Sequence, residues 1–102
     1  MNNFKSRIDN IELRMTENPF KEYKYIEIVK WVPYEGPHTD VKEYCYTLAS
    51  YQYDKDGYPE LHYCGERPLE LNNEEKGLFD YFVRQGYKLH RMDSKNDFKL
   101  MY

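Results

Sequence analysis

Apolar residues recur along the first seventeen positions at intervals that favour a helix. Phe4, Ile8, Ile11 and Met15 are separated by four, three and four residues, a spacing that places them on one face of an α-helix. Asn18-Pro19 would end this helix, because the residue before a proline is disfavoured in the helical region. The pattern therefore predicts a first helix over residues 3–17.

The middle of the chain is dense in β-branched and aromatic residues, which favour strands. Three segments have this character, at residues 23–32, 41–53 and 58–64. Asp54-Lys55-Asp56-Gly57 separates the last two, and a glycine in this place typically takes the left-handed conformation of a three-residue hairpin loop. Pairing of Asp54 with Tyr58 would then fix the register of the hairpin.

That register divides the side chains of the hairpin between the two faces of a sheet. One face is predicted to carry Cys45, Ala49, Tyr51, Leu61 and Tyr63, and the other Tyr44, Tyr46, Leu48, Glu60, His62 and Cys64. The first set has more of the character of a core. We therefore expect Tyr44 and Tyr46 on the less covered face and the two cysteines on opposite faces.

A second helix is predicted over residues 73–85. Asn72 and Glu75 have the spacing of a capping box, and Gly86 is expected to end the helix as a left-handed cap. The buried stripe of this helix would consist of Leu78, Phe79, Phe82 and Val83. Residues 87–92 and 98–102 are predicted to form a terminal hairpin. The predicted fold is a single α+β domain over residues 1–102, in the order α-β-β-β-α-β-β, with an antiparallel sheet packed against two helices.

Composition also indicates in which part of the cell the protein is expected. Hydrophobic residues make up 40% of the chain and charged residues 32%, and no apolar run approaches the roughly 20 residues of a membrane helix. The N-terminus lacks the apolar stretch of a secretion signal, so we expect a soluble cytoplasmic protein in which Cys45 and Cys64 are free thiols. Twelve tyrosines raise the aromatic fraction to 18%, which favours aromatic-rich strands over disorder.

Charge is spread unevenly along the sequence. Residues 54–75 carry seven acids and two bases, whereas residues 76–102 carry six bases and three acids, within a net charge of −3. The acidic stretch is a candidate surface for a basic protein partner, and the basic tail is a candidate for nucleic acid.

The usual local signatures of catalysis and cofactor binding are absent from the sequence. It contains no glycine-rich phosphate loop, no His-Glu-x-x-His and no Cys-x-x-Cys, so we expect no enzyme, no cofactor and no metal site. Zinc held by Cys45, His62 and Cys64 would need the alternative hairpin register and would still lack a fourth ligand. The segment 54–57 is a turn rather than a calcium loop, because Gly65 occupies the position of the closing glutamate.

The order of the first five predicted elements resembles that of double-stranded-RNA-binding domains. Gly36-Pro37-His38 is similar to the loop before the second strand in that family, and the resemblance would imply an RNA partner. That family places a lysine cluster against phosphates at the start of its last helix. Here Asn73-Glu74-Glu75-Lys76 stand in that position, and acids would repel a phosphate backbone. We therefore do not assign the chain to this family.

The preferred hypothesis is a small non-enzymatic protein-binding module with a tyrosine-bearing sheet and an acidic flank. Its candidate contact residues are Tyr44, Tyr46, Asp54, Asp56, Glu60, Glu66 and Glu70. In size, charge and aromatic content the chain is similar to small phage or mobile-element proteins that block host nucleoprotein machines, including anti-CRISPR proteins, a resemblance that implies an inhibitor. The alternative is a nucleic-acid-binding domain that uses Lys88, Arg91, Lys95 and Lys99 of the terminal hairpin, and a second alternative is a small enzyme or metal-binding protein.

Overall fold

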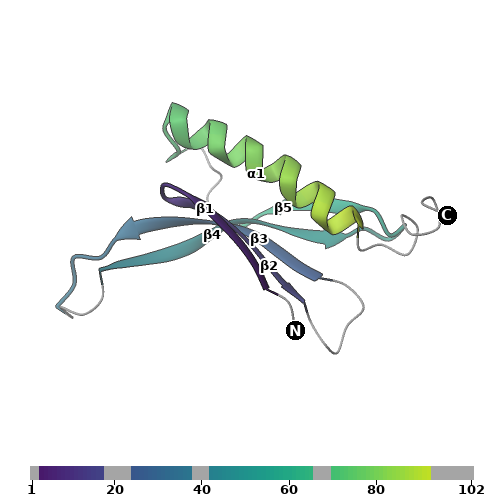
Figure 1. The fold of residues 1–102 in the computed structure, drawn as a ribbon, viewed down its shortest axis with the longest axis horizontal. Coiled ribbons are helices and arrows are strands. Elements are labelled where there is room, and N and C mark those ends of the chain that lie inside the picture. Colours follow the sequence, from purple (N-terminus) through teal and green to yellow (C-terminus); the bar gives the residue numbers. More distant parts are fainter. Residues whose placement is uncertain (1–2, 18–23, 38–41, 66–69, 93–102) are drawn as a thin grey trace.

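The computed structural model describes residues 3–17, 24–37, 42–65 and 70–92. These residues form the elements β1 (Asn3–Ile8), β2 (Ile11–Glu17), β3 (Lys24–Pro33), β4 (Glu43–Tyr53), β5 (Pro59–Tyr63) and α1 (Asn73–Met92). The strands pair in sequence order as an antiparallel sheet, and α1 lies across one face of it (Figure 1). An α+β fold with an antiparallel sheet is therefore confirmed, although the described residues contain one α-helix where two were predicted.

The first predicted helix, over residues 3–17, is wrong, because this segment forms the hairpin of β1 and β2. Ile8 pairs with Ile11, so Asp9 and Asn10 are the two residues of the turn. Asp9 has a φ of 57°, in the left-handed region that Asp and Asn enter more readily than most residues with a side chain. The turn thus falls in the middle of the apolar pattern that favours a helix.

Burial in β2 shows which periodicity the fold uses. Its buried apolar residues are Ile11, Leu13 and Met15, which alternate along the strand. This period of two coexists in the sequence with the helical spacing. The alternating set faces the core, and the helical set is divided between two strands.

The strands β3, β4 and β5 lie where the sequence predicts strands. The backbone N–H of Asp54 donates to the Tyr58 carbonyl over 2.8 Å, and Gly57 has a φ of 85°. Tyr51 pairs with Leu61 across the same hairpin. The predicted turn and register are confirmed.

A β-bulge interrupts β4 at Leu48. Ile28 pairs with Ala49 and Val29 pairs with Thr47, so Leu48 is an extra residue opposite β3. Four consecutive residues of β4, numbers 48–51, are buried, where regular alternation would bury every second one. Residues before the bulge consequently lie on the opposite face from the one that strict alternation predicts.

Four predicted face assignments are therefore wrong, and the first is that of Leu48, which belongs to the core and not to the less covered face. Tyr46 pairs with Lys30, which contacts α1, so Tyr44 and Tyr46 lie on the helix side of the sheet. Cys45 lies on the face turned away from α1, which we call the far face. By alternation with Tyr63, Cys64 also lies on the far face. The bulge accounts for all four differences, because the predicted β4–β5 register itself is correct.

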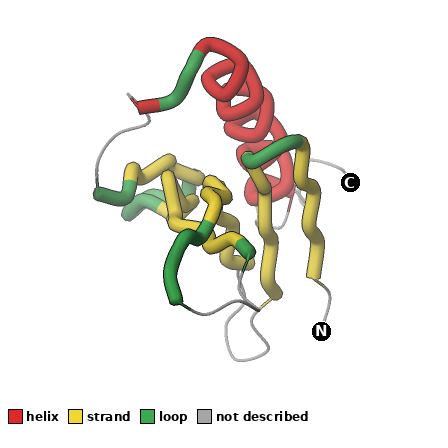
Figure 2. Tube along the Cα trace, turned by 90° about the vertical axis from the view of Figure 1, so that its left-hand side faces the viewer, coloured by secondary structure: helices red, strands yellow, loops and turns green. Residues whose placement is uncertain are grey.

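The core lies between α1 and the helix side of the sheet, and Figure 2 shows the helix as a separate layer over the strands. In α1, Phe79 and Phe82 are buried and Leu78 and Val83 are partly buried, which confirms the predicted stripe. From the rest of the chain the core takes Ile11, Leu13, Met15, Ile26, Ile28, Leu48, Ala49, Tyr51 and Leu71. Burial of this apolar surface is the main force that holds helix and sheet together.

One end of α1 agrees with the prediction from the sequence, and the other end does not. The capping box is confirmed: the Glu75 N–H donates to Asn72 Oδ1 over 2.8 Å, and the Asn72 N–H donates to Glu75 Oε1 over 3.0 Å. Gly86 does not end the helix, which continues to Met92, so the predicted strand over 87–92 is wrong. Residues 98–102 of that predicted hairpin lie outside the described residues.

Gly86 has a packing role instead. A Cβ atom at this position would lie 2.5 Å from Cε2 of Tyr51, closer than two carbon atoms can approach. The missing side chain lets the helix lie directly on the tyrosine ring. The same property that suits glycine to a helix cap therefore serves a close helix–sheet contact here.

Candidate functional site

β3 and β4 continue beyond the N-terminal end of α1 as a two-stranded projection (Figure 1). The pairing of β2 with β3 ends at Lys30, and the pairing of β5 with β4 ends at Ala49. Only the pairing of β3 with β4 continues, to Pro33 and Glu43. We call the described residues 31–37 and 42–47 the arm.

Three tyrosines gather on the helix side of the arm. Tyr34 and Tyr44 pack edge to face, with ring centroids 6.2 Å apart and an interplanar angle of 87°. Tyr44 is 50% exposed and Tyr46, two residues further along β4, is 39% exposed. We call Tyr34, Tyr44 and Tyr46 the arm tyrosines. They form an aromatic surface that the described part of α1 does not cover.

The far face of the arm is anchored to β1. The Arg7 guanidinium lies over the Trp31 ring, 4.8 Å from its centroid, and donates to both carboxylate oxygens of Glu43 over 2.9 and 3.1 Å. Arg7 Nε also donates to the carbonyl of Asp9, at the β1–β2 turn, over 2.8 Å. These contacts bind the start of β4 to the end of β1 across Trp31. The hydrogen bonds from Arg7 hold the pKa of Glu43 below its usual value.

A second arginine extends this anchor along the far face. Arg14 lies on the same indole ring, 5.4 Å from its centroid, and forms an ion pair with Glu12. Its Nη2 donates to Cys45 Sγ over 3.2 Å. The two arginines thus both contact Trp31, whose buried Nε1 has no acceptor among the described residues. Cation–π contacts of this kind favour a fixed position of the ring.

The helix side of the arm is anchored at its base by Glu75. Lys30 Nζ lies 3.3 Å from Glu75 Oε2, and Asn10 Nδ2 donates to the same oxygen. Burial alone would raise the pKa of Glu75, but hydrogen bonds from Asn72, Asn10 and Lys30 outweigh it and lower this pKa. The arm is therefore held on both faces where it leaves the body of the fold.

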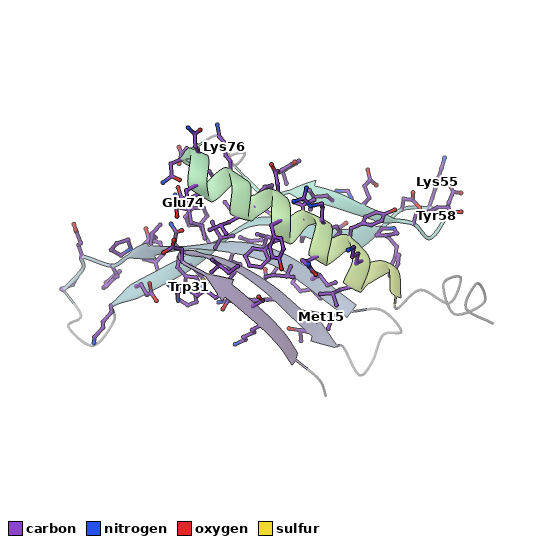
Figure 3. All side chains as sticks on the ribbon, turned by 45° about the horizontal axis from the view of Figure 1, so that its top comes forward. Met15, Trp31, Lys55, Tyr58, Glu74 and Lys76 are labelled. Atoms are coloured by element: carbon purple, nitrogen blue, oxygen red, sulfur yellow. The ribbon has the colours of Figure 1, made fainter. Side chains whose placement is uncertain are left out.

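The acidic residues proposed from the sequence do not gather beside the arm tyrosines. Asp54 and Asp56 occupy the β4–β5 turn, at the other end of β4 from Tyr44, roughly 30 Å away at the rise of a strand. Figure 3 shows Lys55 and Tyr58 of this turn at the opposite end of the molecule from Glu74. The continuous acidic stretch of the sequence is thus divided in space.

The remaining acids are also dispersed. Glu60 lies on the far face, with its Oε2 3.5 Å from Nε2 of His62. Glu70 is exposed just before α1, at the end from which the arm projects, and Glu66 lies outside the described residues. Of the acids proposed as contacts, Glu70 alone is described at the arm end of the molecule.

The basic residues of the alternative hypothesis are not arranged as a hairpin where they are described. Lys88 is exposed on α1, and Arg91 belongs to the last turn of the same helix. Lys95 and Lys99 lie outside the described residues. The hairpin that was expected to present all four is therefore absent over residues 87–92.

A buried aromatic group at the C-terminal end of α1 was not found from the sequence. His90 is fully buried, and its ring stacks on Tyr53 with centroids 4.1 Å apart. The Tyr53 hydroxyl donates to the His90 carbonyl over 3.2 Å, and the Tyr51 hydroxyl donates to the Val83 carbonyl. Burial raises the pKa of Tyr51. These contacts hold the C-terminal end of α1 against β4. The arm lies at the opposite end of β4.

The arm anchor was also missed. Arg7, Trp31 and Glu43 come from three strands and share no local motif, and the first of them stood in a predicted helix. Correct pairing of β1 with β2 would have brought Arg7 into the sheet, but its reach across the arm depends on the twist of the strands. Long-range contacts of this kind carry no signal in a single sequence.

Comparisons of the chain with protein-family models, curated proteins and solved structures found no match. Among the described residues, no group of three or more His, Cys, Asp or Glu side chains is placed to hold a metal ion. No helix in that part of the chain is long and apolar enough to span a bilayer. Cys45 and Cys64 are both free thiols.

Proposed function

We propose that this chain is a non-enzymatic protein-binding module whose contact surface is formed by the arm tyrosines. The observation that carries the proposal is the pair of half-exposed rings, Tyr44 and Tyr46, on a projection anchored at both faces of its base. Tyrosine supplies a large amphipathic contact area and loses little conformational entropy on binding. A projecting, aromatic surface of this kind suits insertion against another macromolecule.

The charges around the arm favour a protein partner over nucleic acid. Stacking of bases on aromatic rings is usually accompanied by cations that contact the phosphates. The cations at the base of the arm are already paired, Lys30 with Glu75 and Arg7 with Glu43. This leaves Lys42, exposed just before β4, as a cation beside the rings with no ion pair among the described residues, which is far less positive charge than a nucleic-acid surface usually presents.

The anchors also support binding energetically. An interface that is fixed before association loses less entropy than one that becomes ordered on binding. Arg7 and Glu75 fix the arm from opposite faces of the sheet, so the direction in which Tyr44 and Tyr46 are presented is set in the free protein. We expect association to change the backbone of the arm little.

The nature of the partner is a narrower proposal. Exposed Glu70 and Glu74 lie at the N-terminal end of α1, from which the arm projects, and they favour a partner with basic groups beside its contact region. The hypothesis of a cytoplasmic inhibitor of a host nucleoprotein machine, of the kind found in phages, rests on composition. The identity of a captured partner would test it directly.

The test is affinity capture with matched tyrosine variants. The double variant Tyr44→Ala/Tyr46→Ala should lose a partner that the wild-type protein retains through washing, whereas Tyr58→Ala/Tyr81→Ala should keep it. The control removes two tyrosines of similar exposure from the turn and from α1. Equal retention by both double variants would contradict the proposal. Retention of nucleic acid that weakens steeply with salt would instead favour the alternative function.

A further inference from the structure

β4 is an interior strand over one half and an edge strand over the other. Residues 49–53 pair with β3 on one side and with β5 on the other. The Cys64 N–H makes a last contact with the Leu48 carbonyl over 2.9 Å, and Gly65, with a φ of 60°, then turns the chain. Among the described residues, nothing pairs with the outer side of residues 43–47.

The direction of the backbone groups on this edge follows from one hydrogen bond. The Tyr34 N–H donates to the Lys42 carbonyl over 3.0 Å, so Lys42 directs its carbonyl toward β3. Because backbone groups alternate along an antiparallel strand, those of Glu43, Cys45 and Thr47 point outward. They form a row of three donors and three acceptors about 13 Å long.

The two edges of the arm differ in their protection. On the β3 edge, the Trp31 N–H is bonded to the Asn10 carbonyl over 2.7 Å, and the next outward position is Pro33, which has no N–H. Proline on an edge strand is a common means of preventing further pairing. The β4 edge contains no proline between residues 43 and 47. It therefore has the properties of an edge that accepts a strand.

We infer that the outer edge of β4 binds an extended segment of another protein by strand addition, in the row beyond Cys64 where no described residue pairs with residues 43–47. This inference rests on the proposed function and specifies how the arm engages its partner. Main-chain hydrogen bonds to Glu43, Cys45 and Thr47 supply affinity, and side chains supply specificity. The segment is about five residues long and carries apolar side chains at the positions beside Tyr44 and Tyr46, where neighbouring strands pack.

The dimensions of the edge favour a short segment over a second copy of this chain. The row beside residues 43–47 is closed at one end by Cys64, which still contacts Leu48. If two copies paired antiparallel through residues 43–47, the arm of each copy would run into the end of β5 in the other copy. A single extended segment that turns away at Leu48 avoids this overlap.

The experiment uses a displayed library of random linear peptides, selected on the full-length protein. Enriched peptides should alternate apolar and variable positions. On binding they should slow amide hydrogen exchange at Glu43, Cys45 and Thr47, whose N–H groups have no partner among the described residues, and change it little at Tyr44 and Tyr46, whose N–H groups face β3. Failure to enrich any peptide, or protection confined to other residues, would overturn the inference.

A variant pair isolates the backbone contact. Cys45→Pro removes one outward N–H and should weaken peptide binding about tenfold or more. Cys45→Ala keeps the N–H while losing the thiol and its contact with Arg14, so it should bind as the wild type does. Equal affinities of the two variants would contradict strand addition. If Cys45→Pro does not fold, the exchange pattern of the wild-type complex decides the question.

The outcomes separate this inference from the proposed function. Binding lost in Tyr44→Ala/Tyr46→Ala without protection of the edge would refute strand addition and retain the tyrosine surface. Protection of the edge amides in a complex that Tyr44→Ala/Tyr46→Ala does not weaken would retain strand addition and refute the tyrosine surface. A dimer in sedimentation experiments that Cys45→Pro makes monomeric would identify a second copy as the occupant and overturn the inference.

Discussion

Tyr51 and Tyr46 lie on the same strand and on the same side of the sheet, but they belong to two different regions. Tyr51 is 2% exposed, contacts Gly86 and donates to a helix carbonyl, whereas Tyr46 is 39% exposed on the arm. The difference is set by the extent of α1 rather than by residue type. In the body of the fold tyrosine is a core residue with a satisfied hydroxyl, and on the arm its ring remains exposed.

The largest expected contrast between the two regions is in stability. Tyr51→Ala removes a buried ring at the helix–sheet contact and should lower the free energy of unfolding by about 3–5 kcal/mol. Tyr46→Ala should change it by no more than about 0.5 kcal/mol, as is usual for exposed positions. Urea denaturation of both variants measures the difference. Similar losses would show that the arm is part of the folding core.

The contact between Gly86 and Tyr51 predicts opposite effects of one substitution at two places in α1. Gly77→Ala meets no atom within 4 Å and should stabilise the protein by about 0.5–1 kcal/mol through helix propensity. Gly86→Ala would force the Tyr51 ring out of its place, and the overpacking should outweigh the same gain, for a net loss of about 1–2 kcal/mol. Thermal unfolding of the two variants shows whether each substitution stabilises or destabilises the protein. Stabilisation by both would mean that the Tyr51 ring lies further from the helix.

The helix-side anchor should make stability depend on pH. Glu75→Gln keeps an acceptor for the Asn72 N–H but loses the charge beside Lys30, at a cost of about 1 kcal/mol at pH 7. The pKa of Glu75 is lowered in the folded state, so its contribution is complete above the unfolded value of about 4.3 and is lost as the pH falls through the folded value. The difference between wild type and variant should shrink as the pH falls below the unfolded value and vanish once Glu75 is protonated in the folded state as well. A difference that persisted there would mean that packing, not charge, is the cause.

The far-face anchor should affect orientation more than stability. Arg7→Ala removes an exposed ion pair and a contact with the Trp31 ring, and the free energy of unfolding should change little. Trp31 is the only tryptophan in the chain, so its fluorescence anisotropy reports the base of the arm. We expect faster depolarisation in Arg7→Ala than in the control Arg84→Ala, which removes an exposed arginine from α1. Identical decays would show that Arg7 does not restrain the arm.

Features set by neighbours in the sequence were predictable. The capping box of Asn72 and Glu75 and the hairpin turn between Asp54 and Tyr58 are local, and both are confirmed. Residues 3–17 carry two periodicities at once, and only packing against β3 selects the strand. The helical spacing of Phe4, Ile8, Ile11 and Met15 favours a helix, whereas the alternation of Ile11, Leu13 and Met15 favours the strand that forms.

Features set by tertiary contacts were not predictable. Gly86 suits a helix end and a close approach equally well, and the choice depends on Tyr51, which belongs to another element. The bulge at Leu48 depends on how β4 meets β3, so the faces of Tyr44, Tyr46 and Cys45 could not follow from alternation alone. The tyrosines were correctly expected to be exposed, but the surface that they share with Tyr34 emerges only from the fold.

The bulge makes chain length, rather than residue identity, decide which surface the arm presents. Removal of the extra residue at Leu48 would restore strict alternation and rotate the first half of β4 by half a turn relative to the second. Cys45 and Thr47 would then occupy the side on which Tyr44 and Tyr46 now stand. A one-residue deletion would thus exchange an aromatic face for a small polar one without changing a single amino acid of the arm.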